Sequence, residues 1–195
     1  IDHLLSKTLT SLISVSKATE ETLLNNSNLF KNGRLKGHVI HNGVPVNEFS
    51  RKDYLKLDIT EDKETVLRIG MVSRLTPDKG HDDLIKAFSR LSPEYQKKMN
   101  VIIIGENERG QKERLKKLAQ NLSLENKIKF LDYIDIDSKK IILSLDLLVS
   151  LTKTYEGFGL SVAEAMSVGT PILATNVGGI NEFFNNECGK LIEPE

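Results

Sequence analysis

The sequence lacks the cysteines that a disulfide framework needs, because Cys188 is the single cysteine among its 195 residues. One thiol cannot form an intramolecular disulfide, so the chain fits a reducing compartment. Long apolar runs are lacking as well, and none approaches the roughly 20 residues of a transmembrane helix. The two absences exclude a disulfide scaffold and a spanning helix within this sequence.

An excess of charge of one sign is also missing, with 27 basic residues against 27 acidic ones. A nucleic-acid binder normally carries clustered Lys and Arg, so this balance argues against nucleic acid as a partner. Hydrophobic residues make up 39% of the chain, which is enough for one good core and a small annex.

Sequence motifs for cofactors are absent too. The run VIIIGENERG at residues 101–110 has no G-x-G-x-x-G fingerprint, and no P-loop lysine motif occurs. The histidines are scattered, and we interpret them as surface or hinge residues rather than metal ligands; they are His3, His38, His41 and His81. We therefore expect neither a bound cofactor nor a metal.

What the sequence does contain, from Thr65 onward, is an alternation of short apolar runs and helical patterns. The strand candidates are Thr65–Val72, Val101–Gly105, Ile128–Leu131, Leu145–Leu151, Pro171–Thr175 and Lys190–Ile192. The helix candidates are Asp78–Leu91, Glu108–Leu122, Asp137–Ser144, Phe158–Val168 and Gly179–Phe184. Strands that are apolar on both faces and separated by helices are typical of a covered parallel sheet. The pattern predicts an α/β fold, a doubly wound, Rossmann-like parallel sheet of about six strands.

The first 64 residues follow a different pattern. Thr10–Val15 and His38–His41 are strand candidates, Ser16 is a suitable helix N-cap, and Asn42-Gly43 is a turn signal. The chain begins without Met and ends directly after an apolar stretch, so both ends look like boundaries inside a longer protein. We predict that residues 1–45 are the tail of a preceding domain, 46–64 a linker and 65–195 the main domain.

Two loops that follow strands carry the candidate chemistry, since ligands of open parallel sheets bind beyond the carboxyl ends of the strands. In residues 70–84, Arg74 follows the strand, Thr76 can cap the next helix, and Pro77 suits its first position. Lys79 lies in the first helical turn, where a cation opposes the helix dipole unless an anion is shared. The alternative for Arg74 and Lys79 is two solvated surface cations.

The second loop spans residues 154–171. Gly157 and Gly159 flank Phe158 where strand gives way to helix, which lets backbone N–H groups approach a phosphate. Glu156 precedes this turn, and Glu164 lies among small apolar neighbours, where ribose hydroxyls would be suitable partners. Phe158 could equally be core packing.

Two other features carry less weight. Gly178-Gly179 precedes a helix candidate and could hold an anion, although a simple turn explains it equally well. The charges of Lys112–Lys117 are interpreted as a solvated helix face.

Taken together, these segments resemble the C-terminal, donor-binding domain of the GT-B-fold retaining glycosyltransferases of family 4 (group 1). The segments that carry the resemblance are ISVSKATEETL, VIHNGVPVNEF, IGMVSRLTPDKGHDDLIKAF, KIKFLDYI and YEGFGLSVAEAMSVGTPILATNVGGINEFF. They cover almost the whole chain in the family's order. The last is the most specific, with its two glutamates separated by seven residues, its Gly-Thr-Pro and its Gly-Gly-x-x-Glu.

The resemblance implies roles for the candidate residues. Arg74 and Lys79 would clamp the donor diphosphate and stabilise its charge as the sugar departs, with Glu156 bordering the transferred sugar as the third catalytic residue. The implied substrate-binding residues are Gly157, Phe158, Gly159 and Leu160 beside the sugar and phosphate, Glu164 at the ribose, and Tyr133 and Ile134 at the base. Asn107 departs from the family pattern, which usually has a second glycine two residues after Gly105.

The implied activity is transfer of a sugar from a nucleoside-diphosphate sugar to an acceptor hydroxyl with retention, in bacterial surface polysaccharide or lipopolysaccharide assembly. A glycan or lipid-linked acceptor would bind an N-terminal domain that this sequence lacks, so the chain alone is expected to be inactive. The implied location is the cytoplasm, with peripheral contact of the full-length protein at the inner face of the membrane. The alternatives are a non-catalytic nucleotide-sugar-binding module and a GT-B epimerase or phosphorylase.

Overall fold

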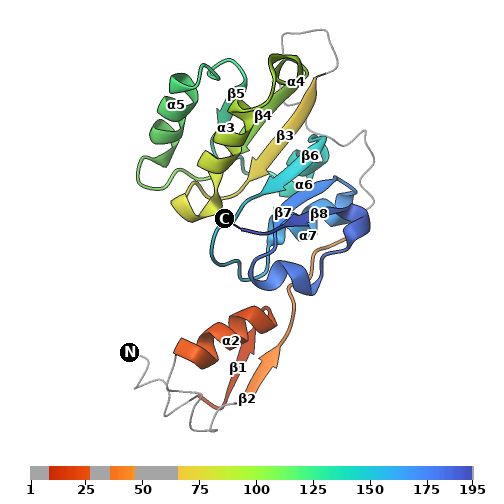
Figure 1. Cartoon of the computed structure of the whole chain (residues 1–195). Helices are drawn as coiled ribbons and strands as arrows, with labels where there is room; N and C mark the ends of the chain where they lie inside the picture. Colours follow the sequence, from red (N-terminus) through yellow and green to blue (C-terminus); the bar gives the residue numbers. More distant parts are fainter. Residues whose placement is uncertain (1–8, 27–35, 47–65, 195) are drawn as a thin grey trace.

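The computed structural model describes residues 9–26, 36–46 and 66–194. Its main part is a six-stranded sheet in the order β5-β4-β3-β6-β7-β8, and every neighbouring pair is parallel (Figure 1). The strands are β3 (Leu67–Val72), β4 (Met99–Ile104), β5 (Ile128–Leu131), β6 (Leu147–Ser150), β7 (Ile172–Thr175) and β8 (Gly189–Ile192). The predicted six-stranded parallel sheet is confirmed.

Helices cover both faces of the sheet. They are α3 (His81–Ser89), α4 (Pro93–Lys97), α5 (Gln111–Asn121), α6 (Ser138–Leu143) and α7 (Leu160–Val168). Strand β4 shows why two layers are needed, because its successive side chains point to opposite faces. Val101 and Ile103 pack in the apolar cluster with α3 and α5, whereas Ile102 and Ile104 pack in the cluster with α6 and α7. All four are buried, so this stretch of the strand is apolar on both faces.

Several predicted boundaries change in the structure. The helix predicted at Asp78–Leu91 is divided into a 3-10 turn, η2 (Pro77–Lys79), and α3, because Gly80 between them has a φ of +78°. A Cβ at Gly80 would collide with the backbone of Leu151, so the break requires glycine. Pro77 occupies the first turn as expected, but the side chain of Thr76 makes no capping hydrogen bond.

Two further expectations are corrected, and one short helix was not predicted. The helix predicted at Gly179–Phe184 is the 3-10 turn η3 (Gly178–Glu182), and the five-residue α4 was not predicted. Lys112 does not lie on a solvated face: it is buried, and its Nζ donates to Asp132 Oδ1 at 2.6 Å. The aliphatic stem of a lysine can cross an apolar surface while its ammonium group reaches a carboxylate.

The N-terminal residues form a second, small unit. It contains β1 (Ser11–Ser14), α2 (Lys17–Asn26) and β2 (Lys36–Val39), and its two strands are parallel. Figure 1 shows it apart from the six-stranded sheet, with α2 facing the loops around η3. Ser16 caps α2 as predicted, since its Oγ accepts the Thr19 N–H at 3.0 Å. The domain boundaries at 45 and 64 stay predictions, because residues 47–65 lie outside the described part.

Candidate functional site

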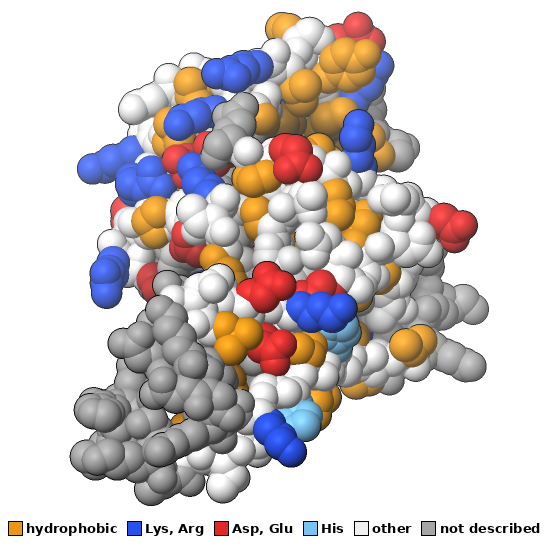
Figure 2. Space-filling model, turned by 60° about the horizontal axis from the view of Figure 1, so that its bottom comes forward, with side chains coloured by type: hydrophobic (Ala, Val, Ile, Leu, Met, Phe, Trp, Pro, Cys, Tyr) orange, Lys and Arg blue, Asp and Glu red, His pale blue; other side chains and the backbone are white. Residues whose placement is uncertain are grey.

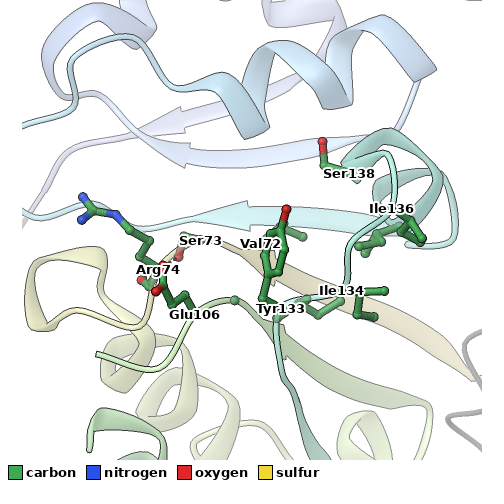
Figure 3. A pocket seen from close by; sticks show the side chains of 11 residues that line it. Val72, Ser73, Arg74, Glu106, Tyr133, Ile134, Ile136 and Ser138 are labelled. Atoms are coloured by element: carbon green, nitrogen blue, oxygen red, sulfur yellow. Dashed lines mark hydrogen bonds between the residues drawn. The ribbon is translucent and has the colours of Figure 1, made fainter. Parts of the chain in front are cut away.

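A pocket of about 340 Å³ opens at the carboxyl ends of β3 and β4, where the sequence places its candidate loops (Figure 3). Arg74 lines it from the loop after β3, and Tyr133 and Ile134 line it from the loop after β5. Three of the predicted residues therefore share one cavity. Ser73, Glu106 and Ser138 also line it. They were not selected from the sequence, although Ser73 and Glu106 follow the ends of β3 and β4 so closely that their position was a usable signal.

Arg74 lies at the rim of this pocket. Its side chain is 64% exposed, and its Nη1 donates to Glu108 Oε1 at 3.0 Å. In Figure 3 the guanidinium extends away from Tyr133. An exposed ion pair of this kind contributes little to stability, so the guanidinium can exchange Glu108 for a stronger anion at low cost.

Lys79 is in a different environment. Its Nζ donates to Glu156 Oε2 at 2.7 Å, and the two side chains are only 14% and 20% exposed. Thr152, which follows β6, donates its hydroxyl to the same Glu156 oxygen at 3.1 Å. The alternative of a solvated surface cation is therefore wrong for Lys79. The fold holds this cation beside a carboxylate at the sheet's carboxyl edge.

His81 is buried, with 1% of its surface exposed, so its interpretation as a surface or hinge residue is wrong. Burial lowers the pKa of His81 to about 4, and a hydrogen bond with the Thr76 backbone only partly opposes this. The neutral ring has its Nε2 3.1 Å from Ser73 Oγ. His81 therefore joins both ends of the 73–80 loop that carries Arg74 and Lys79. Its place in a stripe with Leu84, Ile85 and Phe88, at helical spacing, was the available signal.

The second loop enters α7 through Gly159, whose φ of +92° suits glycine. The N-terminus of α7 presents backbone N–H groups and a partial positive charge, as an anion site requires. Leu160, its first residue, is 51% exposed. The Phe158 side chain is buried and stacks on Phe183 with ring centroids 4.6 Å apart. Core packing thus explains this side chain, and only the main chain of Phe158 can face a donor.

Glu164, in the middle of α7, is half-buried. Burial raises the pKa of Glu164 and the nearby Asp137 adds to the rise, while a hydrogen bond with the Ser138 side chain and the charge of Lys139 oppose it. Because Ser138 also lines the 340 Å³ pocket, Glu164 lies beside that cavity.

The structure therefore gathers the predicted residues in two groups at one edge of the sheet. The pocket group contains Arg74, Tyr133 and Ile134 in the lining, with Glu164 behind it at Ser138, and the loop group contains Lys79, Glu156 and Gly157–Leu160. On the face that Figure 2 shows, basic side chains gather at the upper left with acidic ones interspersed. None of the helices in the described ranges is long and apolar enough to cross a bilayer.

A doubly wound parallel α/β domain with its candidate loops at the carboxyl edge has an architecture that commonly binds nucleotides. Residues 56–195 match the family described as glycosyl transferases group 1, and the chain belongs to that family. The HepE protein of Anabaena, solved in complex with UDP and glucose, superposes with a TM-score of 0.83 at 27% identity. That comparison covers 98% of this chain and 51% of HepE.

Curated relatives agree with this family. The uncharacterized glycosyltransferase MJ1607 of Methanocaldococcus jannaschii is 29% identical over an alignment of 189 residues that covers 92% of this chain and 46% of the relative. The O-antigen biosynthesis glycosyltransferase WclY of Escherichia coli is 25% identical over an alignment of 155 residues that covers 78% of this chain and 41% of the relative. The chain thus spans about half the length of these relatives or less.

Proposed function

We propose that this chain is the donor-binding part of a retaining glycosyltransferase that moves a sugar from a nucleoside-diphosphate sugar to an acceptor hydroxyl. The observation that carries the proposal is the partly buried contact of Lys79 with Glu156, placed beside the N-terminus of α7. A cation, a carboxylate and a helix N-terminus at one sheet edge suit a ligand that carries both phosphate and sugar hydroxyls.

The two groups of residues bind different parts of the donor. The 340 Å³ pocket takes the nucleoside, with the base near Tyr133 and Ile134 and the ribose hydroxyls donating to Glu164. The diphosphate lies between the Arg74 guanidinium, the Lys79 ammonium and the N-terminus of α7. The backbone of Gly157–Leu160 and the Glu156 carboxylate border the sugar.

Catalysis in this scheme is mainly electrostatic. Negative charge develops on the diphosphate as the glycosidic bond breaks, and positioned cations stabilise that charge more than they stabilise the intact donor. The leaving phosphate oxygen takes the proton of the acceptor hydroxyl on the same face of the sugar, which gives retention. No bound metal is needed in this mechanism.

The other partners belong to the longer protein. A glycan or lipid-linked acceptor binds a part that this chain does not contain, and the product serves bacterial surface polysaccharide or lipopolysaccharide assembly. The named role of WclY in O-antigen biosynthesis supports this assignment. We place the reaction in the cytoplasm, with peripheral contact at the inner face of the membrane.

Substitution of each cation tests the proposal. In the full-length protein, Arg74→Ala and Lys79→Ala should each lower kcat/KM by roughly 10- to 150-fold, because each removes a charge-assisted hydrogen bond. Lys98→Ala is the matched control, since Lys98 is 61% exposed and pairs with Glu94 on the surface. Transfer from UDP- and GDP-sugars is measured beside thermal unfolding, with and without EDTA.

The outcomes separate the alternatives. Activity within about twofold of the wild type for both variants would remove the cation clamp from the mechanism. Tight donor binding without transfer to any glycan or lipid-linked acceptor would favour the non-catalytic binding module. Loss of transfer in EDTA would show that a metal is required.

A further inference from the structure

The carboxylate of Glu182 joins the small N-terminal unit to the main sheet. Its Oε2 accepts the backbone N–H of Lys17 and its Oε1 accepts that of Ala18, both at 2.9 Å. His41 Nε2 lies 2.9 Å from the same Oε2. These partners precede residue 45, whereas Glu182 ends η3, more than 140 positions later. The Glu182 side chain is only 13% exposed.

This carboxylate completes the start of α2. The first amides of a helix have no partner within the helix. Ser16 takes the Thr19 amide, and Glu182 takes the two amides before it. Partial burial raises the pKa of Glu182, but the hydrogen bonds from Ala18, Lys17 and His41 outweigh it, so this pKa lies below its ordinary value. The ionised form is therefore the one that the fold holds.

The turn that ends in Glu182 also supports the donor loop. The Gly179 N–H donates to the Glu156 carbonyl oxygen at 2.9 Å. Gly178 has a φ of +58°, and a Cβ there would collide with the same carbonyl oxygen. The backbone of Glu156 therefore rests directly on η3.

The helix α2 holds the same loop from its other side. Thr19 Oγ1 donates to the Gly157 carbonyl oxygen at 3.3 Å and accepts the Tyr155 hydroxyl at 2.8 Å. The contacts close a ring: α2 holds residues 155 and 157, η3 holds residue 156, and Glu182 ties α2 to η3. The side chain at the centre of the held segment is Glu156, which receives Lys79 and Thr152.

We propose that Glu182 is a positioning residue for sugar transfer, which fixes the Glu156–Gly157 backbone through α2 and η3 and so places the Lys79–Glu156 pair. The proposal rests on the proposed function. Glu182 touches neither donor nor acceptor in this scheme. Glu182 acts through the position of the Lys79–Glu156 pair. A misplacement of about 1 Å in a catalytic group can lower a rate by roughly 100-fold.

Two variants break the ring at opposite points. Glu182→Gln keeps the size of the side chain but replaces one accepting oxygen with a donor, and Thr19→Val removes the hydroxyl that holds Gly157. Thr19→Ser keeps the hydroxyl and should restore the wild-type behaviour. Glu94→Gln is the charge-matched control, because Glu94 forms an exposed surface pair with Lys98.

Amide hydrogen exchange on the 195-residue chain tests the ring without any activity. Glu182→Gln should speed exchange in the peptides that cover α2 and in those that cover residues 151–160, by roughly tenfold, as expected for loss of a charge-assisted hydrogen bond. Thr19→Val should speed exchange at residues 151–160, and Glu94→Gln should change neither region. Faster exchange in α2 alone would overturn the proposal, because Glu182 would then be a helix cap only.

Kinetics on the full-length protein test the consequence for transfer. Both variants should lower kcat by roughly 10- to 100-fold, whereas the KM of the intact nucleotide-sugar should change much less, because the positioned cations stabilise the developing charge more than the intact donor. Unchanged kcat in Glu182→Gln and Thr19→Val would overturn the positioning role. A wild-type protein that transfers no sugar would instead refute the proposed function, and the exchange data would still decide whether the ring exists.

Discussion

At the scale of single residues, the site depends on polar groups that are themselves buried and satisfied. His81 is the clearest case, since it lies behind the loop of Arg74 and Lys79 and bonds Ser73 at 3.1 Å. A solvated histidine would be free to ionise near neutral pH, whereas this one is held neutral by burial. Because burial disfavours the charged ring, His81 should make the stability of the fold depend on pH.

We predict that His81 makes the fold less stable in weak acid. The pKa of His81 is about 4 in the folded chain, against its ordinary 6.5. Between these values the unfolded chain binds the proton more readily, so stability falls as the pH drops from 6.5 to 4, by about 3 kcal/mol in all. Urea unfolding at several pH values, compared with His81→Gln, isolates this contribution. If the free energy of unfolding changed with pH in the same way in both proteins, this prediction would be wrong.

Single residues also show how far the sequence could define the site. Arg74 and Lys79 could be selected because they follow a strand in a parallel sheet, where ligands bind. Glu156 could be selected as well, but its pairing with Lys79 could not be predicted, because 77 positions separate the two residues and only the folded sheet joins their loops. Glu182 is harder still, since the amides that it binds carry no side-chain signature.

At the scale of elements, the sequence predicted well wherever periodicity was long and apolar. All six strands were located because each contains a short apolar, largely β-branched segment, even though β5 and β8 each include one lysine, Lys129 and Lys190. The errors occur where a single residue or a few polar residues determine the local secondary structure. Gly80 divides a predicted helix, and α4 was missed because its five residues, Pro93–Lys97, include no buried one.

The helix α7 provides a test in which stability and affinity should move in opposite directions. Burial raises the pKa of Glu164, so the fold loses stability as pH rises from the ordinary pKa of this carboxyl through its raised value. Glu164→Gln removes that loss and should unfold at a higher temperature at pH 7.5, but not at pH 4. The same change should weaken UDP or GDP binding by roughly 10- to 150-fold, because ribose hydroxyls lose a charged acceptor.

Differential scanning fluorimetry and calorimetry measure the two effects of Glu164→Gln. Glu125→Gln, at an exposed position, is the matched control and should change neither. Lower stability with unchanged affinity would show that Glu164 only supports α6 through Ser138 and does not bind the nucleotide.

At the scale of the whole molecule, the described chain consists of two unequal sheets joined by polar contacts. Glu182 supplies one link, and Lys139, which donates to the carbonyl oxygen of Pro45 at 3.3 Å, supplies another. The small N-terminal unit leaves Ile13 and Ile40 65% and 57% exposed. Because the chain spans about half the length of its relatives, we expect the other wall of the donor cleft to lie outside it.

We therefore predict that the chain by itself binds a nucleoside diphosphate weakly and transfers no sugar. The loops that would hold the diphosphate and ribose are present, so part of the affinity should remain. The acceptor hydroxyl has no wall to place it at the anomeric carbon, and water is not excluded from the cleft. Positioning can supply about 7–11 kcal/mol of a barrier, and its loss is enough to stop turnover. Calorimetry with UDP and GDP measures the first half, and a radiolabelled transfer assay on the same chain measures the second. Sugar transfer by the chain alone would show that the acceptor site lies within these residues and that the proposed domain division is wrong.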